Sequence, residues 1–308
     1  MTRPVFLADP AELASAAVGA EVHLGGPEAH HAATVRRLRT GEEVDLVDGA
    51  GRRVTGTVAA VAKDRLAVSV TAVLDEPAPT PQLVLVQALA KGGRDEQAVE
   101  SATELGVDRV VPWQADRCVS RWDAKAAKGR ARWASVAEGA AKQSRRAFVP
   151  AVDDVVTTSS LAAAVSRASA DGAVVLVLHE SATERLAALL GKGERGAGVA
   201  PPGEGAPTAT PREPAPQTHV VPDRIPREPA PQTHDVPARI PREPAPQGLA
   251  GAAAVWCVVG PEGGISDDET DRLVAAGARL VRLGPHVLRT SSAGPAAIAA
   301  LGVRLGRW

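Results

Sequence analysis

The feature that most constrains the fold is an alternation, from Leu83 onward, of short apolar runs with amphipathic stretches. The runs LVLVQALA and VDRVVPW have the length and composition of buried strands, and residues 94–105 between them repeat with helical periodicity. Further strands are expected at 173–178, 255–259 and 280–283, and a further helix at 126–145. Strands and helices that alternate in this way form parallel sheets with crossover helices. The sequence therefore predicts an α/β domain.

The first 75 residues follow a different pattern. The runs 43–47, 54–61 and 66–73 alternate apolar and polar residues, and Asp48-Gly49 provides a turn between the first two runs. This spacing favours a small β-barrel. The segment EPAPTP, residues 76–81, is a proline-rich joint. We therefore predict one domain over residues 1–75 and a second domain over residues 80–308.

One segment of the second domain does not fit its pattern. Residues 196–248 hold 14 of the 25 prolines and no aromatic residue, and PREPAPQ occurs three times with a period of 15 residues. A solenoid repeat would carry an apolar face to bury against its neighbours, but Ile225 and Ile240 are almost the only bulky apolar residues of the segment. We interpret it as a disordered insertion with polyproline II character.

Cysteine content and hydropathy indicate a cytoplasmic protein. Cys118 and Cys257 are the only cysteines, too few for a disulfide framework and without CxxC spacing. The N-terminal MTRPVFLADPAEL has no basic segment followed by an apolar stretch, so no signal peptide is expected. No run approaches the roughly 18 apolar residues of a membrane span. We therefore expect no membrane partner. His30 and His31 have no third ligand nearby, so we expect no metal site.

The strongest candidate for a binding site is the segment GPEGGISDDE, residues 260–269, directly after the strand AVWCVV. Glycines at the carboxyl end of a strand let the backbone approach a ligand closely, and ligands of parallel sheets bind at this end. Ser266 followed by Glu269 is typical of a capping box, which predicts a helix start there. No lysine follows the glycines, so the segment is not a GxxxxGK[ST] phosphate loop.

A second glycine-ended strand lies about 20 residues later and is followed by LGPHVLRTSSAG, residues 283–294. GPEGG followed by LGxxxLRTxxA resembles the C-terminal signature of the bacterial 16S rRNA (uracil-N3) methyltransferase family. ELGV at 104–107 and EGAAKQSRRAFVP at 138–150 resemble two further blocks of that family, and HHAATVRRLRTGEEVDLVDG at 30–49 is similar to its PUA-like domain. The resemblance covers nearly the whole chain outside the proline-rich segment.

This resemblance implies a SPOUT α/β domain with a trefoil knot, preceded by a PUA-like RNA-binding β-barrel. It also implies a homodimer that binds S-adenosyl-L-methionine in the knot and methylates 16S rRNA in the small ribosomal subunit. The cofactor-binding residues that it implies are Leu178, His179, Glu180, Gly260, Pro261, Glu262, Gly263, Gly264, Leu283, Gly284, Leu288, Arg289 and Thr290. The family often has a glutamate where this chain has Ser291, so no catalytic role rests on that position, and Ser291 is expected to cap the last helix instead.

Two residues are candidates for catalysis. Methylation of uracil N3 requires loss of the N3 proton and stabilisation of the negative charge that develops on the base. Arg289 is the candidate for that stabilisation, because its guanidinium is always charged and forks well to carbonyl oxygens; a salt bridge within the loop is the alternative. Glu262 is a candidate general base or a partner for the sulfonium, with Glu180 as a weaker rival; a plain loop carboxylate is equally compatible with the sequence at Glu262.

Local charge indicates an RNA-binding surface, although the formal net charge is only −1. Residues 117–146 hold nine Lys or Arg against two acidic residues, and a second basic cluster lies at 36–39. Contacts with phosphates supply most sequence-independent RNA affinity. The predicted RNA-binding residues are Arg36, Arg37, Arg39, Arg117, Arg121, Lys142, Arg145 and Arg146. Trp122 and Trp133 are candidates for base stacking, with core packing favoured for Trp133.

Three other functions remain open on the sequence. The first is a SPOUT ribose 2′-O-methyltransferase, although such enzymes usually carry an Asn-rich final motif that LRTSSAGPAA lacks. The second is a non-catalytic RNA-binding or ribosome-assembly factor, which cofactor binding would distinguish. The third is a phosphate-binding α/β enzyme that uses GPEGG to bind a nucleotide.

Overall fold

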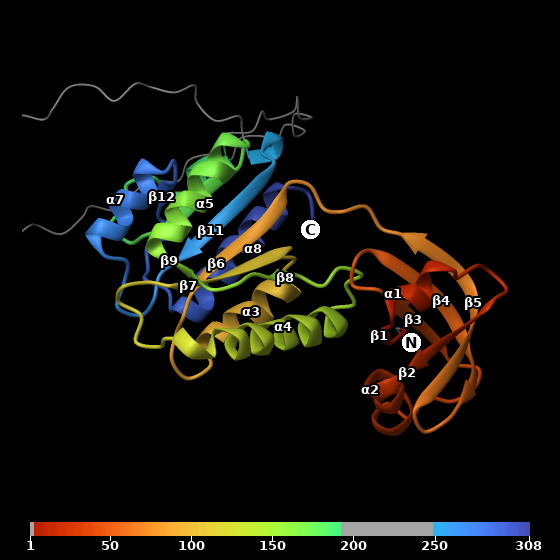
Figure 1. Ribbon diagram of the computed structural model, residues 1–308. Coiled ribbons are helices and arrows are strands. Elements are labelled where there is room, and N and C mark those ends of the chain that lie inside the picture. The colour runs from red at the N-terminus through yellow and green to blue at the C-terminus, as the bar shows by residue number, and fades with distance from the viewer. Residues whose placement is uncertain (1–2, 192–248) are drawn as a thin grey trace, which may run out of the picture. The chain divides into compact units, whose positions relative to one another are not determined.

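The N-terminal part of the chain folds into a strongly curled five-stranded sheet (Figure 1). The computed structural model describes residues 3–191 and 249–308, so the predicted insertion at 196–248 lies outside the described residues. The strand order is β1-β3-β4-β5-β2, and every pair except β1–β3 is antiparallel. The strands are β1 (Val5–Leu7), β2 (Glu21–Gly25), β3 (Glu43–Val47), β4 (Arg52–Val61) and β5 (Arg65–Asp75). The short helices are α1 (Pro10–Ala14), α2 (Gly26–His30) and the π-helical turn η1 (His31–Val35).

The curl of this sheet follows from irregular pairing between β4 and β5. The register shifts twice, between Thr55 and Gly56 and between Val58 and Ala60. Such bulges bend the bulged strand and increase its twist. A Cβ on Gly56 would lie 2.5 Å from the backbone oxygen of Ser69, so only glycine permits this close approach of the two strands.

The second sheet is entirely parallel, as the alternating pattern predicted. Its strand order is β12-β10-β11-β6-β7-β8, with β9 also paired to β7. The strands are β6 (Gln82–Ala88), β7 (Arg109–Gln114), β8 (Ala151–Val152), β9 (Val156–Thr157), β10 (Val174–Leu178), β11 (Ala254–Val259) and β12 (Arg279–Val281). The helices are α3 (Arg94–Glu104), α4 (Ala126–Gln143), α5 (Thr158–Ala170), α6 (Leu186–Leu190), α7 (Asp267–Ala275) and α8 (Thr290–Arg304), with 3₁₀ turns η2 (Asp123–Lys125) and η3 (Leu249–Gly251).

Helices cover the parallel sheet in two groups. Helices α3, α4 and α8 pack together on one side, and α5 and α7 pack together on the other (Figure 1). Because both faces are covered, the central strands are apolar throughout, and Leu83, Leu85, Leu176 and Val258 are fully buried. Trp113 and Trp133 are the largest buried side chains of this core, which confirms the core position expected for Trp133. Within the described residues no helix is long and apolar enough to cross a membrane.

Candidate active site

The predicted cofactor loops meet at one edge of the parallel sheet. Strand β10 pairs in parallel with β11 on one side and with β12 on the other, so the segments that follow Leu178, Val259 and Val281 leave the sheet at the same edge. They enclose a cavity of about 640 Å³, next to a smaller one of about 180 Å³. All thirteen predicted cofactor residues line one or both cavities: Leu178, His179, Glu180, Gly260, Pro261, Glu262, Gly263, Gly264, Leu283, Gly284, Leu288, Arg289 and Thr290.

The glycine loop, residues 260–265, is closely packed against itself. A Cβ on Gly260 would lie 2.6 Å from Cγ1 of Ile265. Gly264 has a φ of +74°, and its N–H donates to the carbonyl of Pro261 at 2.9 Å, which closes a tight turn. The backbone of Gly263 is not left-handed, so its φ does not require glycine. A Cβ there would instead meet Cβ of Arg117 at 3.1 Å, so a larger residue at 263 would push on Arg117.

The capping box predicted after the glycine loop is confirmed and has a second role. The Ser266 hydroxyl accepts from the N–H of Glu269, and the Glu269 carboxylate accepts from the N–H of Ser266 at 3.0 Å. Glu269 is fully buried, and its other oxygen accepts from the Asp116 N–H at 2.9 Å and from the Thr158 hydroxyl at 2.7 Å. Burial opposes its ionisation, but these hydrogen bonds outweigh burial and lower the pKa of Glu269. Glu269 thus joins the glycine loop to the loop that carries Arg117.

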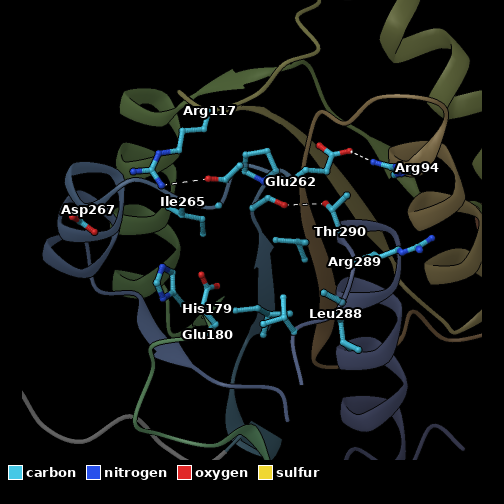
Figure 2. A pocket seen from close by; sticks show the side chains of 18 residues that line it. Arg94, Arg117, His179, Glu180, Glu262, Ile265, Asp267, Leu288, Arg289 and Thr290 are labelled. Atoms are coloured by element: carbon cyan, nitrogen blue, oxygen red, sulfur yellow. Dashed lines mark hydrogen bonds and ion pairs between the residues drawn. The ribbon is translucent and has the colours of Figure 1, made fainter. Parts of the chain in front are cut away.

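Glu262 is already engaged by two donors. Its Oε1 lies 3.0 Å from Nη1 of Arg94 and accepts the Lys91 N–H at 3.4 Å (Figure 2). Partial burial opposes ionisation, but hydrogen bonds from its own backbone N–H, from Arg94 and from Lys91 outweigh it, and the pKa of Glu262 is lowered. A carboxylate with a depressed pKa is a poor proton acceptor near neutral pH. The geometry therefore favours a positioning role for Glu262 over the general-base role expected from the sequence.

Arg289 occupies the first turn of the last helix. It is the N-cap residue of α8, in extended conformation, and its carbonyl accepts the N–H groups of Ser292 and Ala293. The expectation that Ser291 caps this helix was wrong: Ser291 lies inside the first turn and is buried. The Arg289 side chain is exposed, lines the larger cavity and has no ion pair or hydrogen bond with any other residue that the structure describes. Figure 2 shows Arg289 and Arg94 on one side of the glycine loop and Arg117 on the other.

The start of the glycine loop and the start of α8 are linked by a chain of hydrogen bonds. The hydroxyl of Thr290 donates to the carbonyl of Gly260 at 2.9 Å and accepts from Nε2 of Gln87, also at 2.9 Å. Thr290 was expected from the sequence but Gln87 was not, although an amide within the apolar run LVLVQA is a signal that could have found it. Arg94 was missed as a member of the site because it resembles an ordinary helix residue in sequence, whereas Glu269 was expected only as part of the capping box.

His179 has a defined hydrogen-bonding pattern at the far wall of the cavity. Its Nδ1 accepts the Ser181 N–H at 3.3 Å, which places the proton of the neutral ring on Nε2. The neighbouring Glu180 is exposed, lines both cavities and has no ion pair among the described residues. Among all the residues that the structure describes, no group of three or more His, Cys, Asp or Glu residues has the geometry to hold a metal ion.

Known protein families match both parts of the chain. The model of an RNA methyltransferase domain matches residues 76–200 and 239–302, and that of an RNA methyltransferase PUA domain matches residues 24–71. Ribosomal RNA small subunit methyltransferase E of Mycobacterium tuberculosis is 39% identical over 94% of this chain and 89% of its own length. The chain belongs to this methyltransferase E family.

Other members of the methyltransferase E family and solved structures agree with this assignment. The Bacillus subtilis member is 26% identical over 90% of this chain and 87% of its own length. A crystal structure of the Neisseria gonorrhoeae member bound to S-adenosyl methionine has a TM-score of 0.69 at 22% identity and covers 98% of both chains. A Legionella pneumophila structure with the cofactor SAM has a TM-score of 0.68, also at 22% identity and with 98% of both chains covered. The expected fold class, a SPOUT α/β domain after a PUA-like domain, is confirmed.

The predicted RNA-binding residues of this methyltransferase E family member differ in their environments. Arg36, Arg37, Arg39 and Arg145 are exposed. Arg121 is exposed next to Asp123 at 3.6 Å, and Arg117 lines the larger cavity, where its Nη1 donates to the carbonyl of Gly263 at 3.3 Å. These six side chains are available to an RNA ligand or border the site.

The other two predicted RNA-binding residues are engaged inside the protein. Nζ of Lys142 lies 2.6 Å from Glu28 and 3.4 Å from Glu138. Arg146 is largely buried: its Nη1 donates to the carbonyls of Thr103 and Val107, each at 2.7 Å, and burial lowers the pKa of its guanidinium. The geometry speaks against an RNA contact by Arg146, because two backbone carbonyls engage its Nη1 and its Nη2 lies 3.4 Å from Asp108.

Trp122 packs against Trp133 with ring centroids 5.1 Å apart and planes at 79°. This edge-to-face contact holds Trp122 half-buried over the start of α4, where a Cβ on Gly129 would also clash with its ring. Base stacking by Trp122 therefore requires that a face of its ring be free of this packing or become free by rotation of the ring.

Proposed function

We propose that this protein methylates N3 of a uridine in 16S rRNA, with S-adenosyl-L-methionine as the methyl donor. The observation that carries the proposal is the larger cavity formed by the three carboxyl-side loops, with the Arg289 guanidinium at its edge, which no described residue neutralises. The names of the relatives support the reaction class, and the Neisseria gonorrhoeae structure supports the cofactor. The choice of uracil N3 rests on the family resemblance that the motifs GPEGG and LGPHVLRT carry.

The cavity fits a cofactor of this size and charge. Its volume of about 640 Å³ lies within the usual range of roughly 300–1,000 Å³ for sites of small molecules. The glycine loop offers backbone groups without side chains, and Leu178 and Leu288 provide apolar surface on the other two loops. When bound, S-adenosylmethionine supplies an electrophilic methyl group on a sulfonium. Glu180, Glu262 and Asp267 supply negative charge around the cavity and Arg94, Arg117 and Arg289 supply positive charge. Groups of both signs suit a ligand that carries a sulfonium, an amino group and a carboxylate.

Arg289 is the residue that we assign to charge stabilisation. Attack by N3 requires departure of its proton, and the resulting negative charge spreads over N3, O2 and O4 of the ring. A guanidinium in the cavity offers two parallel N–H donors to such an edge. Because Glu262 is paired with Arg94, Glu180 is the better candidate to accept the proton: it is exposed, lines both cavities and has no ion pair among the described residues.

We propose that residues 1–75 act as a PUA-like RNA-binding domain and that residues 80–308 form the methyltransferase domain. The exposed arginines at 36, 37 and 39 support an RNA-binding role for the first, and Arg117, Arg121 and Arg145 extend a basic surface over the second. We further propose that the substrate is 16S rRNA in the small ribosomal subunit, that the protein acts in the cytoplasm and that it is a homodimer. The family resemblance supports the substrate and the homodimer, and a reaction on ribosomal RNA supports the cytoplasmic location.

Mass mapping of 16S rRNA from cells with and without this protein tests the reaction. We expect one uracil to lose a base methyl group in its absence. A missing ribose methyl group would identify a 2′-O-methyltransferase instead. If no methyl group changes, calorimetry distinguishes the remaining alternatives: S-adenosylmethionine binding without turnover indicates an assembly factor, and nucleotide binding indicates a phosphate-binding enzyme.

The role of Arg289 is tested by its alanine and lysine variants. Arg289→Ala should lower the single-turnover rate by about 10²-fold or more, the scale of losing one preorganised donor to a developing anion. Arg289→Lys should restore little, because a point charge does not replace the planar fork. Cofactor and RNA affinities should change much less than the rate. If Arg289→Ala instead melts early, binds cofactor weakly and turns over normally at saturation, Arg289 only stabilises the loop.

A further inference from the structure

Gln87 is a polar residue at a position where burial makes an unpaired amide costly. It ends the apolar run of β6, is 0% exposed, and pairs in register with Val259, the last residue of β11. An amide transferred from water into such surroundings costs roughly 1–3 kcal/mol unless it is hydrogen-bonded. Its NH₂ is hydrogen-bonded, whereas its Oε1 is buried without a partner among the described residues. A leucine would avoid this cost, so the hydrogen bonds of the NH₂ are the feature to explain.

The direction of the hydrogen bonds around Gln87 is fixed by chemistry. The carbonyl of Gly260 can only accept, so the Thr290 hydroxyl must donate its single proton there. The Thr290 oxygen is then free to accept, and the group that faces it at 2.9 Å must be the NH₂ of Gln87. The same NH₂ donates to the carbonyl of Ala88 at 3.2 Å. The amide orientation of Gln87 is therefore determined by its partners.

This chain of bonds connects two walls of the cavity to the middle of the sheet. Gly260 is the first residue of the glycine loop, and Thr290 is the first residue of α8, directly after Arg289. Strand β6 lies between β11 and β7, away from both edges of the sheet. The Thr290–Gly260 bond joins the start of α8 to the start of the glycine loop, and Gln87 holds the Thr290 hydroxyl against β6. Displacing a reacting group by about 1 Å can cost about 10²-fold in rate.

We propose that Gln87 is a positioning residue, which acts through Thr290 to hold Arg289 in register with the glycine loop. The proposal deepens the assignment of Arg289 made above and rests on it. Gln87 itself does not line the cavity, so it is not expected to touch either ligand. Its effect should therefore appear in the rate of the bound complex more than in the affinity for cofactor or RNA.

The first experiment compares Gln87→Met with wild type in single-turnover methylation at saturating cofactor and RNA. Methionine keeps the length of the side chain but cannot donate. We expect the rate to fall by about tenfold or more, whereas the cofactor affinity measured by calorimetry should stay within about threefold of wild type. Gln87→Glu should be worse, because a carboxylate draws the Thr290 proton to itself and leaves the Gly260 carbonyl without its donor. The exposed Gln97 of α3 gives a matched control, and Gln97→Met should leave the rate unchanged.

A second pair of variants tests the same chain if the first fails to fold. Thr290→Val keeps the shape but removes the hydroxyl, whereas Thr290→Ser retains it. We expect the valine variant to lose rate like Gln87→Met and the serine variant to recover most of it. Equal rates for the valine and serine variants would overturn the proposal.

A double-mutant cycle separates positioning of Arg289 from general stabilisation. In the Arg289→Ala background, Gln87→Met should reduce the rate by less than about twofold, because the group that it positions is already gone. A full further tenfold loss in that background would show that Gln87 acts independently of Arg289 and would overturn the proposal. Failure of the proposed function looks different, because wild type would then bind no S-adenosylmethionine or methylate no RNA.

Discussion

Two neighbouring arginines at the end of α4 provide a direct test of the structure. Both belong to the basic stretch that suggests RNA contact, yet Arg145 is exposed and Arg146 is largely buried. Arg146 gives two short hydrogen bonds to backbone carbonyls and lies 3.4 Å from Asp108. Alanine at 146 should therefore destabilise the fold, and alanine at 145 should weaken RNA binding.

The magnitude for Arg146→Ala follows from its contacts. Hydrogen bonds from a charged donor contribute about 1.5–3 kcal/mol each, and two are lost. In the variant, Asp108 still has two partners, the Arg307 guanidinium at 2.9 Å and the Leu83 N–H. The loss of stability should therefore be smaller than that for a buried carboxylate left without any partner. We expect a decrease of about 2–4 kcal/mol in the free energy of unfolding, which is roughly 5–15 °C in Tm for a fold of this size.

Arg145→Ala is the matched control. It should change the free energy of unfolding by less than about 0.5 kcal/mol, because the side chain is exposed. It should lower RNA affinity and reduce the slope of log K against log salt by about 0.7–0.9 for one lost phosphate contact. Denaturant melts and RNA titrations at several salt concentrations measure both variants. The reasoning is refuted if Arg146→Ala melts like wild type and shows the larger loss of RNA affinity.

Three further predictions follow from the glycine loop and the insertion. Glu269→Gln should destabilise the fold by about 2–4 kcal/mol, because either orientation of the buried amide leaves a backbone N–H, of Asp116 or Ser266, facing NH₂ instead of an acceptor. The pKa of Glu269 is lowered in the fold, so ionised Glu269 stabilises the folded state above its unfolded-state pKa, and this contribution is lost as pH falls through the folded-state pKa. The stability of Glu269→Gln should therefore depend less on pH in acid than that of wild type. Gly264→Ala should lower the free energy of unfolding by about 1–2 kcal/mol, because Gly264 has a positive φ. Gly263→Ala should instead displace Arg117 and change ligand affinity. Equal Tm shifts for the two variants would contradict this. Deletion of residues 198–247, which the family model leaves largely unmatched, should change stability by less than about 1 kcal/mol, and a large loss of Tm or activity would show that the segment contributes to the fold.

The sequence by itself determined the parallel sheet and the location of the site. Both follow from local patterns: apolar runs of strand length, helical periodicity between them, and glycines where strands end. Because the carboxyl ends of neighbouring parallel strands meet at one edge, the loops after Leu178, Val259 and Val281 had to come together once the strand order placed β10 between β11 and β12. The capping box at Ser266 was equally local, since its two partners are three residues apart.

The roles of individual polar side chains were decided only by the tertiary structure. Glu262 is paired with Arg94 across 168 residues of sequence, and Gln87 donates to Thr290 across 203. Arg146 lies next to Arg145 in the chain, but α4 ends at Gln143 and the backbone turns before Arg146. The Arg145 side chain therefore faces solvent, whereas the Arg146 side chain faces the carbonyls of Thr103 and Val107. A charge or an amide in a sequence has the same appearance whether its partner is water, RNA or a distant backbone group. Only the packing of remote segments determines which of these it contacts.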